Sequence, residues 1–418
     1  MTRRAAILIL IDGLTPSMLE ATDAPTLRFL LDHGTYRRAT STFPSLTPVC
    51  LASVATGGHP DVHGIPHLVW WNRGEQRLVE YGSSFGALVA AGLARGIRDT
   101  IVNLNERHLL RSAETVYEAL EDAGLTTAAI NITTYRGRNV HVSTVPGLPP
   151  VHGPKRFFFY SVYESDRTGA AVAWRNRAGG SIDAYAGQVG RWLVTRDAFD
   201  LLVFYLPDYD YASHALGPDA AHDALKRADA SIASLVEAAG GRDEFLERYA
   251  IVLCSDHGQS RIERCAKLRV DGAQVTASNR AAMLYAEAGA DPRALAAALD
   301  GEESVDVALF LEDGAVVARS RGEEDPSLLD RFPDGRERAA AALRNPNAGD
   351  VIVSAARGWE FADLAGRNHV GGGSHGSLGE EDSLVPMLTI GFDAPPASIT
   401  GLKGLLLAHF GVGVARAA

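Results

Sequence analysis

The 418-residue chain contains very little cysteine: Cys50, Cys254 and Cys265 are all it has. Three cysteines in a chain of this length do not form a disulfide framework, and their spacing matches no zinc finger. Cys50 and Cys254 lie in apolar segments, where we expect them to be buried. The scarcity of cysteine favours a reducing compartment, and we expect a cytoplasmic protein.

Long apolar runs and basic stretches are also missing. No segment approaches the roughly 18 apolar residues that a membrane-spanning helix requires, so we expect no membrane association. The N-terminal run AAILILIDG follows two arginines. It is too short for a signal peptide and lacks a small-residue cleavage site, which favours a buried strand. The net charge of -11, without any basic stretch, argues against binding a nucleic-acid polymer.

The sequence does show the alternation of an α/β protein. Its 46% apolar and 22% charged residues are typical of a globular protein. Helical periodicity at 114–124 and 224–240, each ending in glycine, predicts two helices. Continuous apolar runs predict buried strands at 5–11, 126–132, 200–206, 249–254 and 386–391. Together they predict a doubly wound, mostly parallel central sheet with helices on both faces.

Two regions interrupt this alternation. Residues 64–112 are rich in Gly, Trp and Arg and hold no long periodic helix, and residues 138–185 include FFFYSVYES and a Gly-rich turn. We expect both to be insertions that lie over the strand ends of a single catalytic domain spanning 1–418. Residues 278–345 contain three candidate strands and predict a small α+β cap.

Acidic residues and a histidine follow two of the predicted strands. Asp12 comes directly after the run 5–11, and Asp256 and His257 come just after the run 249–254, followed by Gly258. Ligands of open α/β sheets bind at the carboxyl ends of the strands, and Asp and His are both metal ligands. Alternatively, Asp12 is a turn or helix-cap residue, and Asp-His-Gly occurs by chance.

Thr47 precedes Pro48 and an apolar helical segment that runs to Gly57. A threonine at the N-cap with proline at the first helical position is a good helix start. A hydroxyl there faces the positive end of the helix dipole, which favours its alkoxide and a bound phosphate. Taken alone, Thr47 is equally explained as a plain helix cap.

Two further segments carry candidate metal ligands. Asp210 and His214 are four residues apart, so one helical turn brings them to one face, and their oxygen and imidazole ligands suit zinc. Asp208 competes with Asp210 for this role. His375, with His369 as a second candidate, lies in the glycine-rich segment 366–382. An incidental histidine in a loop remains the alternative for both segments.

In this order, the candidate residues resemble the alkaline phosphatase superfamily, and more closely its type I phosphodiesterase/nucleotide pyrophosphatase branch. Members of that branch look like FPTxTxP…TG…P…HGI around the nucleophile. The similar elements here are FPSLTP at 43–48, TG at 56–57, Pro60 and HGI at 63–65. The branch also has Asp-x-x-x-His before Gly-Pro, which matches Asp210 and His214 before Gly217-Pro218 and favours Asp210 over Asp208.

The resemblance implies Thr47 as the nucleophile, and also as a metal ligand, beside two divalent ions that we expect to be Zn²⁺. One ion would be held by Asp210, His214 and His375, and the other by Asp12, Asp256 and His257. Two ions about 4 Å apart clamp an ester phosphate and stabilise its attacking and leaving oxygens. A phospho-threonine would form at the activated hydroxyl, and water would then release it.

The chain departs from this branch at one position. Nucleotide pyrophosphatases of the branch carry an asparagine five residues beyond the HGI histidine, where it helps hold a phosphoryl oxygen. Leu68 stands there in this chain, and Asn72 or His67 would have to substitute. Aromatic and basic residues of the insertions would either contact the leaving group or pack against the core; they are Trp70, Trp71, Tyr135, Arg136 and Phe157–Tyr160.

We therefore predict a metal-dependent hydrolase of phosphate esters, of the phosphodiester or nucleotide pyrophosphatase type, acting on a small phosphate- or phosphonate-ester substrate. A phosphonate hydrolase similar to phosphonoacetate hydrolase, a phosphomonoesterase and an inactive metal-binding relative remain alternatives. A sulfatase is excluded, because TPVCL at 47–51 lacks the residues of the Cys/Ser-x-Pro-x-Arg motif. No oligomeric state is predicted.

Overall fold

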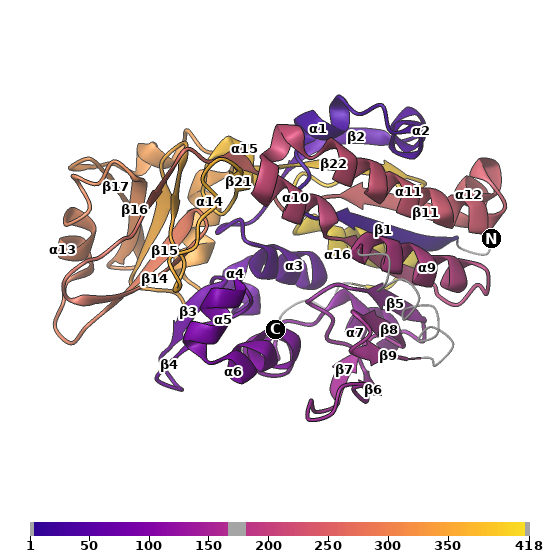
Figure 1. The fold of residues 1–418 in the computed structure, drawn as a ribbon, viewed down its shortest axis with the longest axis horizontal. Coiled ribbons are helices and arrows are strands. Elements are labelled where there is room, and N and C mark those ends of the chain that lie inside the picture. The colour runs from indigo at the N-terminus through magenta and orange to yellow at the C-terminus, as the bar shows by residue number, and fades with distance from the viewer. Residues whose placement is uncertain (1–3, 166–180, 414–418) are drawn as a thin grey trace.

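The computed structural model describes residues 4–165 and 181–413, so part of the predicted insertion at 138–185 lies outside the described residues. Its main body is built on an eight-stranded sheet with the order β2-β22-β11-β1-β10-β5-β8-β9 (Figure 1). These strands are β1 (Ala5–Ile11), β2 (Thr35–Thr40), β5 (Thr127–Ile130), β8 (Arg156–Phe159), β9 (Tyr163–Glu164), β10 (Leu201–Leu206), β11 (Tyr249–Cys254) and β22 (Leu384–Ile390).

The five neighbouring strands β11, β1, β10, β5 and β8 run parallel. β22 pairs antiparallel with both β11 and β2, and β9 pairs antiparallel with β8. Leu10 of β1 lies opposite Tyr205 of β10 and Cys254 of β11, so these three central strands end side by side. The predicted α/β class with a mostly parallel central sheet is confirmed.

Both faces of this sheet are covered by helices. Alternate residues of β1 belong to two separate cores, with Ile7 and Ile9 in one and Leu8 and Leu10 in the other, as the period of two in a strand requires. The first core includes α2 (Pro25–His33), α9 (Ile182–Val194) and α11 (His222–Ala239). The second includes α3 (Thr47–Thr56), α7 (Val116–Asp122) and α16 (Gly401–Phe410).

A second sheet lies beside the main body, at the left of Figure 1. Its strand order is β14-β15-β19-β16-β17-β18, and we call the segment 273–355 the cap. One face packs with α14 (Gly335–Leu343) and residues near the start of α3, and the other packs with α13 (Pro292–Ala297). The strands are β14 (Ala273–Ser278), β15 (Ala281–Ala286), β16 (Val305–Glu312), β17 (Ala315–Ser320), β18 (Glu323–Glu324) and β19 (Val351–Ala355). The sheet is thus wider than the segment 278–345 of the sequence analysis.

The region 64–112 forms a short hairpin followed by helical turns. β3 (Val69–Asn72) pairs with β4 (Arg77–Glu80), and then come α5 (Phe85–Ala91), α6 (Leu93–Arg98) and the π-helical segment Asp99–His108. The smaller elements elsewhere include α1 (Pro16–Glu20), α4 (Pro60–His63), α12 (Arg242–Arg248), α15 (Glu380–Ser383), β6 (Asn139–His141), β7 (Val151–Gly153), β12 (Ser260–Arg261), β13 (Arg264–Ala266), β20 (Trp359–Phe361) and β21 (Gly373–Ser374).

One part of the predicted insertion 138–185 belongs to the main sheet instead. The aromatic segment Arg156–Phe159 forms β8 and pairs in parallel with β5. Phe157 and Phe159 face one core and Phe158 faces the other. Aromatic residues favour strands that are buried on both sides, so this segment extends the sheet. Among the described residues, no helix is long and apolar enough to cross a membrane.

Candidate active site

The carboxyl ends of three adjacent parallel strands converge on one cluster of acids and histidines. Asp12 follows β1, and Asp256 and His257 follow β11 after one residue. Gly13 allows the chain to turn here, because its φ is +66° and a side chain would come within 2.8 Å of an Asp210 carboxylate oxygen. Its backbone N–H donates to Asp256 Oδ1 at 3.3 Å, which links the ends of β1 and β11.

Thr47 is the first residue of α3 rather than its N-cap. Leu46 occupies the N-cap position, with an extended backbone, and Pro48 follows as the second helical residue. The predicted N-cap role of Thr47 is therefore wrong by one position, and no side chain caps the N-terminus of α3 through a hydrogen bond. Thr47 Oγ1 instead lies 3.1 Å from His257 Nε2, still at the positive end of the helix.

Asp210 and His214 lie on α10 (Asp208–Leu216), which follows β10. His214 Nε2 is 3.3 Å from Asp210 Oδ2, one helical turn away. Asp208 takes no part in the cluster, because its carboxylate accepts hydrogen bonds from the Ser181 hydroxyl and the Asp183 backbone N–H at the start of α9. The structure thus brings Asp210 to the cluster and leaves Asp208 as a helix-capping residue.

Three histidines of the cluster are held in the same way, through a hydrogen bond of Nδ1 to a backbone carbonyl. Nδ1 of His214, His257 and His375 lies 2.8, 3.0 and 2.7 Å from the backbone carbonyls of Gly373, Gly258 and Ser45. A carbonyl only accepts, so each Nδ1 carries the proton and donates it. In the neutral form of each ring, Nε2 then carries the lone pair and points into the cluster, and such outer hydrogen bonds are typical of metal-binding histidines.

Two carboxylates of the cluster each have a buried oxygen without a hydrogen-bond donor among the described residues. These oxygens are Asp12 Oδ1 and Asp256 Oδ2. Burial, reinforced by the charges of Asp256 and Asp210, raises the pKa of Asp12 well above its ordinary value. Two sets of ligand atoms within 4.8 Å of one another suit metal ions, namely Asp210, His257 and His375, and Asp12, Asp256 and His257. The second set is the predicted one, whereas the first holds His257 in place of the predicted His214, which contacts Asp210 from outside the set. The donor set fits divalent metals, since uncompensated buried charge is costly.

Electrostatics differ between the two sides of the cluster. Burial alone would raise the pKa of Asp210, but the neighbouring His214, His375 and His257 lower it below its ordinary value. Burial and the charge of His257 lower the pKa of His375 well below the ordinary histidine value. His375 therefore stays neutral, as a metal ligand must.

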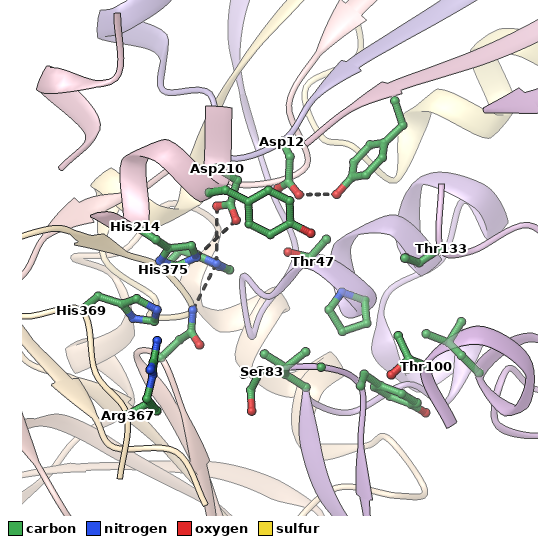
Figure 2. Close-up of a pocket in the computed structure, with 18 of the residues that line it drawn as sticks. Asp12, Thr47, Ser83, Thr100, Thr133, Asp210, His214, Arg367, His369 and His375 are labelled. Carbon is green, nitrogen blue, oxygen red and sulfur yellow. Dashed lines mark hydrogen bonds and ion pairs between the residues drawn. The ribbon is translucent and has the colours of Figure 1, made fainter. Parts of the chain in front are cut away.

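The cluster lies at the floor of a cleft of about 710 Å³ (Figure 2). One wall holds apolar and hydroxyl side chains, namely Leu68, Thr100 and Leu104 of the region 64–112, Phe159 at the end of β8, and Val162. The opposite wall is polar and holds Asn279, Arg367, Asn368 and His369. Figure 2 shows Thr47 between the metal-ligand candidates and the hydroxylic wall, with Arg367 and His369 on the other side.

Comparison with known proteins identifies the family. Residues 6–378 match the family described as type I phosphodiesterase / nucleotide pyrophosphatase. The chain belongs to this family. The type I phosphodiesterases are phosphoric ester hydrolases, so the predicted family and enzyme class are confirmed. No curated protein sequence matches the chain.

Solved structures share the fold at low sequence identity. An inactive threonine-to-alanine variant of murine ectonucleotide pyrophosphatase/phosphodiesterase 5, in complex with AMP, is 14% identical, with a TM-score of 0.70 over 99% of this chain and 96% of that one. Phosphonoacetate hydrolase from Sinorhizobium meliloti 1021, in complex with phosphonoformate, is 18% identical, with a TM-score of 0.65 over 100% and 96%. Human ectonucleotide pyrophosphatase/phosphodiesterase 5 is 16% identical, with a TM-score of 0.65 over 99% and 96%.

Neither residue predicted to replace the asparagine of nucleotide pyrophosphatases lines the cleft of this type I phosphodiesterase. Asn72 ends β3 and accepts a hydrogen bond from the Glu75 backbone N–H at 3.0 Å. His67 is fully buried, and its Nδ1 accepts from the Val69 backbone N–H at 3.1 Å. His67 therefore shapes the start of the hairpin and Asn72 its turn, whereas Leu68 does line the cleft.

Most aromatic candidates for leaving-group contact are packing residues. Trp70 is 1% exposed in the core shared with the cap, and Tyr135 packs its ring against Phe157. Arg136 is also buried, and its guanidinium donates to Glu118 and to three backbone carbonyls. Of these predicted candidates, only Phe159 and Tyr160 line the cleft.

His369 lies beside the type I phosphodiesterase cluster but outside both ligand sets. Its ring stacks on that of His214 with centroids 4.1 Å apart, and its Nδ1 is 2.9 Å from the buried Glu360 carboxylate. His375 is instead stacked on His257 with centroids 3.6 Å apart. The geometry thus favours His375 over His369 as the ligand from the glycine-rich segment.

Three contacts of the cluster were not predicted from the sequence. Tyr205 donates its phenolic hydrogen to Asp12, Gln259 donates its amide hydrogen to Asp210, and Asn279 lies 3.2 Å from His375. Tyr205 has a recoverable signal, because it lies one residue before the end of the predicted strand 200–206. Asn279 has none, since it reaches the cluster from the cap.

Proposed function

We propose that this protein is a two-zinc phosphodiesterase that cleaves small phosphodiesters or nucleotide pyrophosphate bonds through a covalent intermediate on Thr47. The observation that carries the proposal is the position of Thr47 Oγ1, 3.1 Å from His257 Nε2, beside buried carboxylate oxygens that have no donor among the described residues. The inactive threonine-to-alanine variant of the murine relative, which was solved with AMP, supports a threonine nucleophile.

Asp12, Asp256, His257 and Thr47 would hold one ion, and Asp210, His214 and His375 the other. Bound there, the ions would supply positive charge that lowers the pKa of the Thr47 hydroxyl and offsets charge on the phosphoryl oxygens. Tyr205 and Gln259 hold the carboxylates of Asp12 and Asp210 in place. Three backbone carbonyls fix the histidine rings.

The chemistry takes place in two displacements at phosphorus. The Thr47 hydroxyl loses its proton and its oxygen forms a bond to phosphorus while the bond to the leaving oxygen breaks; the leaving oxygen takes up a proton, and the alcohol or phosphate departs. A water oxygen then loses a proton and forms a bond to phosphorus, the Thr47 oxygen–phosphorus bond breaks, and a proton returns to the Thr47 oxygen. In-line attack from Thr47 would send the leaving group away from Thr47, and Figure 2 shows Arg367 and His369 across the cleft from Thr100 and Thr133.

The test is to trap the intermediate. The zinc-loaded protein is mixed with bis(p-nitrophenyl) phosphate, quenched in acid within one turnover and digested for mass spectrometry. A p-nitrophenyl-phosphoryl adduct is expected on the peptide that contains Thr47. Turnover without an adduct on that peptide would overturn the nucleophile assignment, and failure to cleave any diester would overturn the proposed activity.

A phosphonate hydrolase is the second candidate, and Arg367 favours it. Arg367 is the one lysine or arginine among the residues that line the cleft, and its guanidinium has no ion pair with any residue between 4 and 165 or 181 and 413. A free guanidinium suits a carboxylate on the leaving group, as in phosphonoacetate, the ligand of another structure of the Sinorhizobium relative. Comparing phosphonoacetate with bis(p-nitrophenyl) phosphate distinguishes the two candidates.

A further inference from the structure

The segment before β3 offers the cleft no amide to hold a phosphoryl oxygen. Leu68 lines the cleft at the position where the relatives' asparagine is expected, and its side chain has no hydrogen to donate. Asn72 and His67 are turned to their own backbone neighbours. A diester bound at the cluster would therefore need a neutral donor from another part of the chain.

The cap provides one at Asn279. This residue lies in the turn between β14 and β15, is 5% exposed and lines the cleft. Its φ of +56° is in the left-handed region, which asparagine tolerates better than most residues. The turn itself could be made with glycine, so the conformation alone does not account for an amide that faces the cluster.

Hydrogen bonds orient that amide. The Ser278 hydroxyl donates to Asn279 Oδ1 at 2.8 Å, which leaves the NH₂ group to face His375. Asn279 Nδ2 is 3.2 Å from His375 Nε2, the nitrogen whose lone pair points into the cluster. When that lone pair binds a metal ion, it no longer accepts from Asn279. The amide hydrogens are then left at the cleft surface beside the ion.

We propose that Asn279 donates a hydrogen bond to a non-bridging phosphoryl oxygen of the substrate, and that it replaces the asparagine absent at Leu68. This inference rests on the proposed two-metal function. Asn279 comes from the cap sheet, whereas the family's asparagine would come from the segment before β3. The same chemical group would thus enter the cleft from a different element.

The test measures orthophosphate binding without turnover. The zinc-loaded Thr47→Ala protein is titrated with orthophosphate by calorimetry, alone and combined with Asn279→Gly, which tolerates the positive φ. Loss of a hydrogen bond to a charged oxygen is expected to weaken binding by about 10- to 100-fold, with zinc content and melting temperature unchanged. Adding Leu68→Asn to the double variant is expected to restore part of the affinity, and Asn72→Ala to have no effect.

Each outcome is decisive. Unchanged phosphate affinity after Asn279→Gly would overturn the proposal, and loss of one zinc equivalent would show that Asn279 only supports His375. If the Thr47→Ala protein binds zinc but no phosphate, the proposed phosphoryl function fails and the inference about Asn279 fails with it, whereas unchanged affinity after Asn279→Gly overturns the inference alone. In the Thr47-containing enzyme, Asn279→Gly is expected to lower kcat/KM for diesters by a similar factor.

Discussion

Thr47 Oγ1 and His257 Nε2 lie 3.1 Å apart although 210 residues separate them in the chain. The contact joins the start of α3 to the end of β11 and places a hydroxyl beside a nitrogen lone pair and the orphan oxygens of Asp12 and Asp256. A threonine that served only the helix would not need this neighbour.

Replacing Thr47 separates chemistry from metal binding. Thr47→Ala is expected to lower kcat for bis(p-nitrophenyl) phosphate by at least about 10³-fold, because removing a nucleophile eliminates the covalent path. Zinc content is expected to stay near that of the unaltered protein, since six other side chains remain to hold the ions. Steady-state kinetics and atomic emission spectroscopy measure the two quantities. Thr47→Ser is the matched control and should retain measurable turnover, whereas wild-type turnover by Thr47→Ala would refute the assignment.

Replacing the two histidines of the glycine-rich segment distinguishes ligand from neighbour. His375→Ala is expected to lose one zinc equivalent at low free zinc, because His375 Nε2 belongs to a ligand set with Asp210 and His257. His369→Ala is expected to keep both, because His369 pairs with Glu360 and only stacks on His214. Zinc stoichiometry in a metal-buffered dialysis measures this, and the reverse pattern would show that the ligand is His369.

Without metal, the acid cluster is expected to make stability depend on pH. Burial and neighbouring carboxylates raise the pKa of Asp12 in the folded protein. Above the ordinary aspartate pKa, the native state therefore keeps a proton that the unfolded chain has released, and the free energy of unfolding falls as pH rises through this window. In chelator, Asp12→Asn should melt at a higher temperature than the unaltered protein at pH 8, with the gap closing toward pH 4. A gap that is independent of pH would contradict the raised pKa.

Arg136 is expected to stabilise the fold and not to select substrates. Its buried guanidinium is paired with Glu118, and removing one member of such a pair leaves an unpaired buried charge, at a cost of about 3–5 kcal/mol. Arg136→Met should therefore lower the melting temperature while the ratio of diester to monoester kcat/KM stays constant. The surface variant Arg111→Ala, whose side chain is 65% exposed, is the control and should cost less than about 1 kcal/mol. A changed substrate ratio in Arg136→Met would restore the predicted role in specificity.

The parts of the site that could be predicted from the sequence depend on local patterns, either a strand end or the repeat of a helix. Asp12 and Asp256 each follow an apolar run closely, so strand topology alone brings them together. Asp210 and His214 depend only on the helical repeat. The position of β8 was missed because its aromatic residues looked like an insertion, although they form two-sided sheet packing.

Asn279, by contrast, depends on how the cap docks against the main body, and no local pattern encodes that. Asn72, His67 and Arg136 do not line the cleft for the same reason. Each has the right chemistry, but tertiary packing turns Asn72 and His67 to the backbone and Arg136 to a buried carboxylate. The end of a strand and the period of a helix can be read from neighbouring residues. The direction in which a side chain of a long insertion points depends on tertiary packing.

The position of His375 near the end of the chain also bears on when the cluster is completed during translation. Asp12 and Thr47 leave the ribosome early, but His375 follows the complete cap in the chain and comes only ten residues before Val385 of β22. Domains generally fold as they are synthesised, from the N-terminus onward. The last candidate ligand of the cluster is therefore translated only after more than 370 residues. On the proposed two-metal function, we expect metal to bind late in the synthesis of the chain, so that chains truncated before the glycine-rich segment retain little metal.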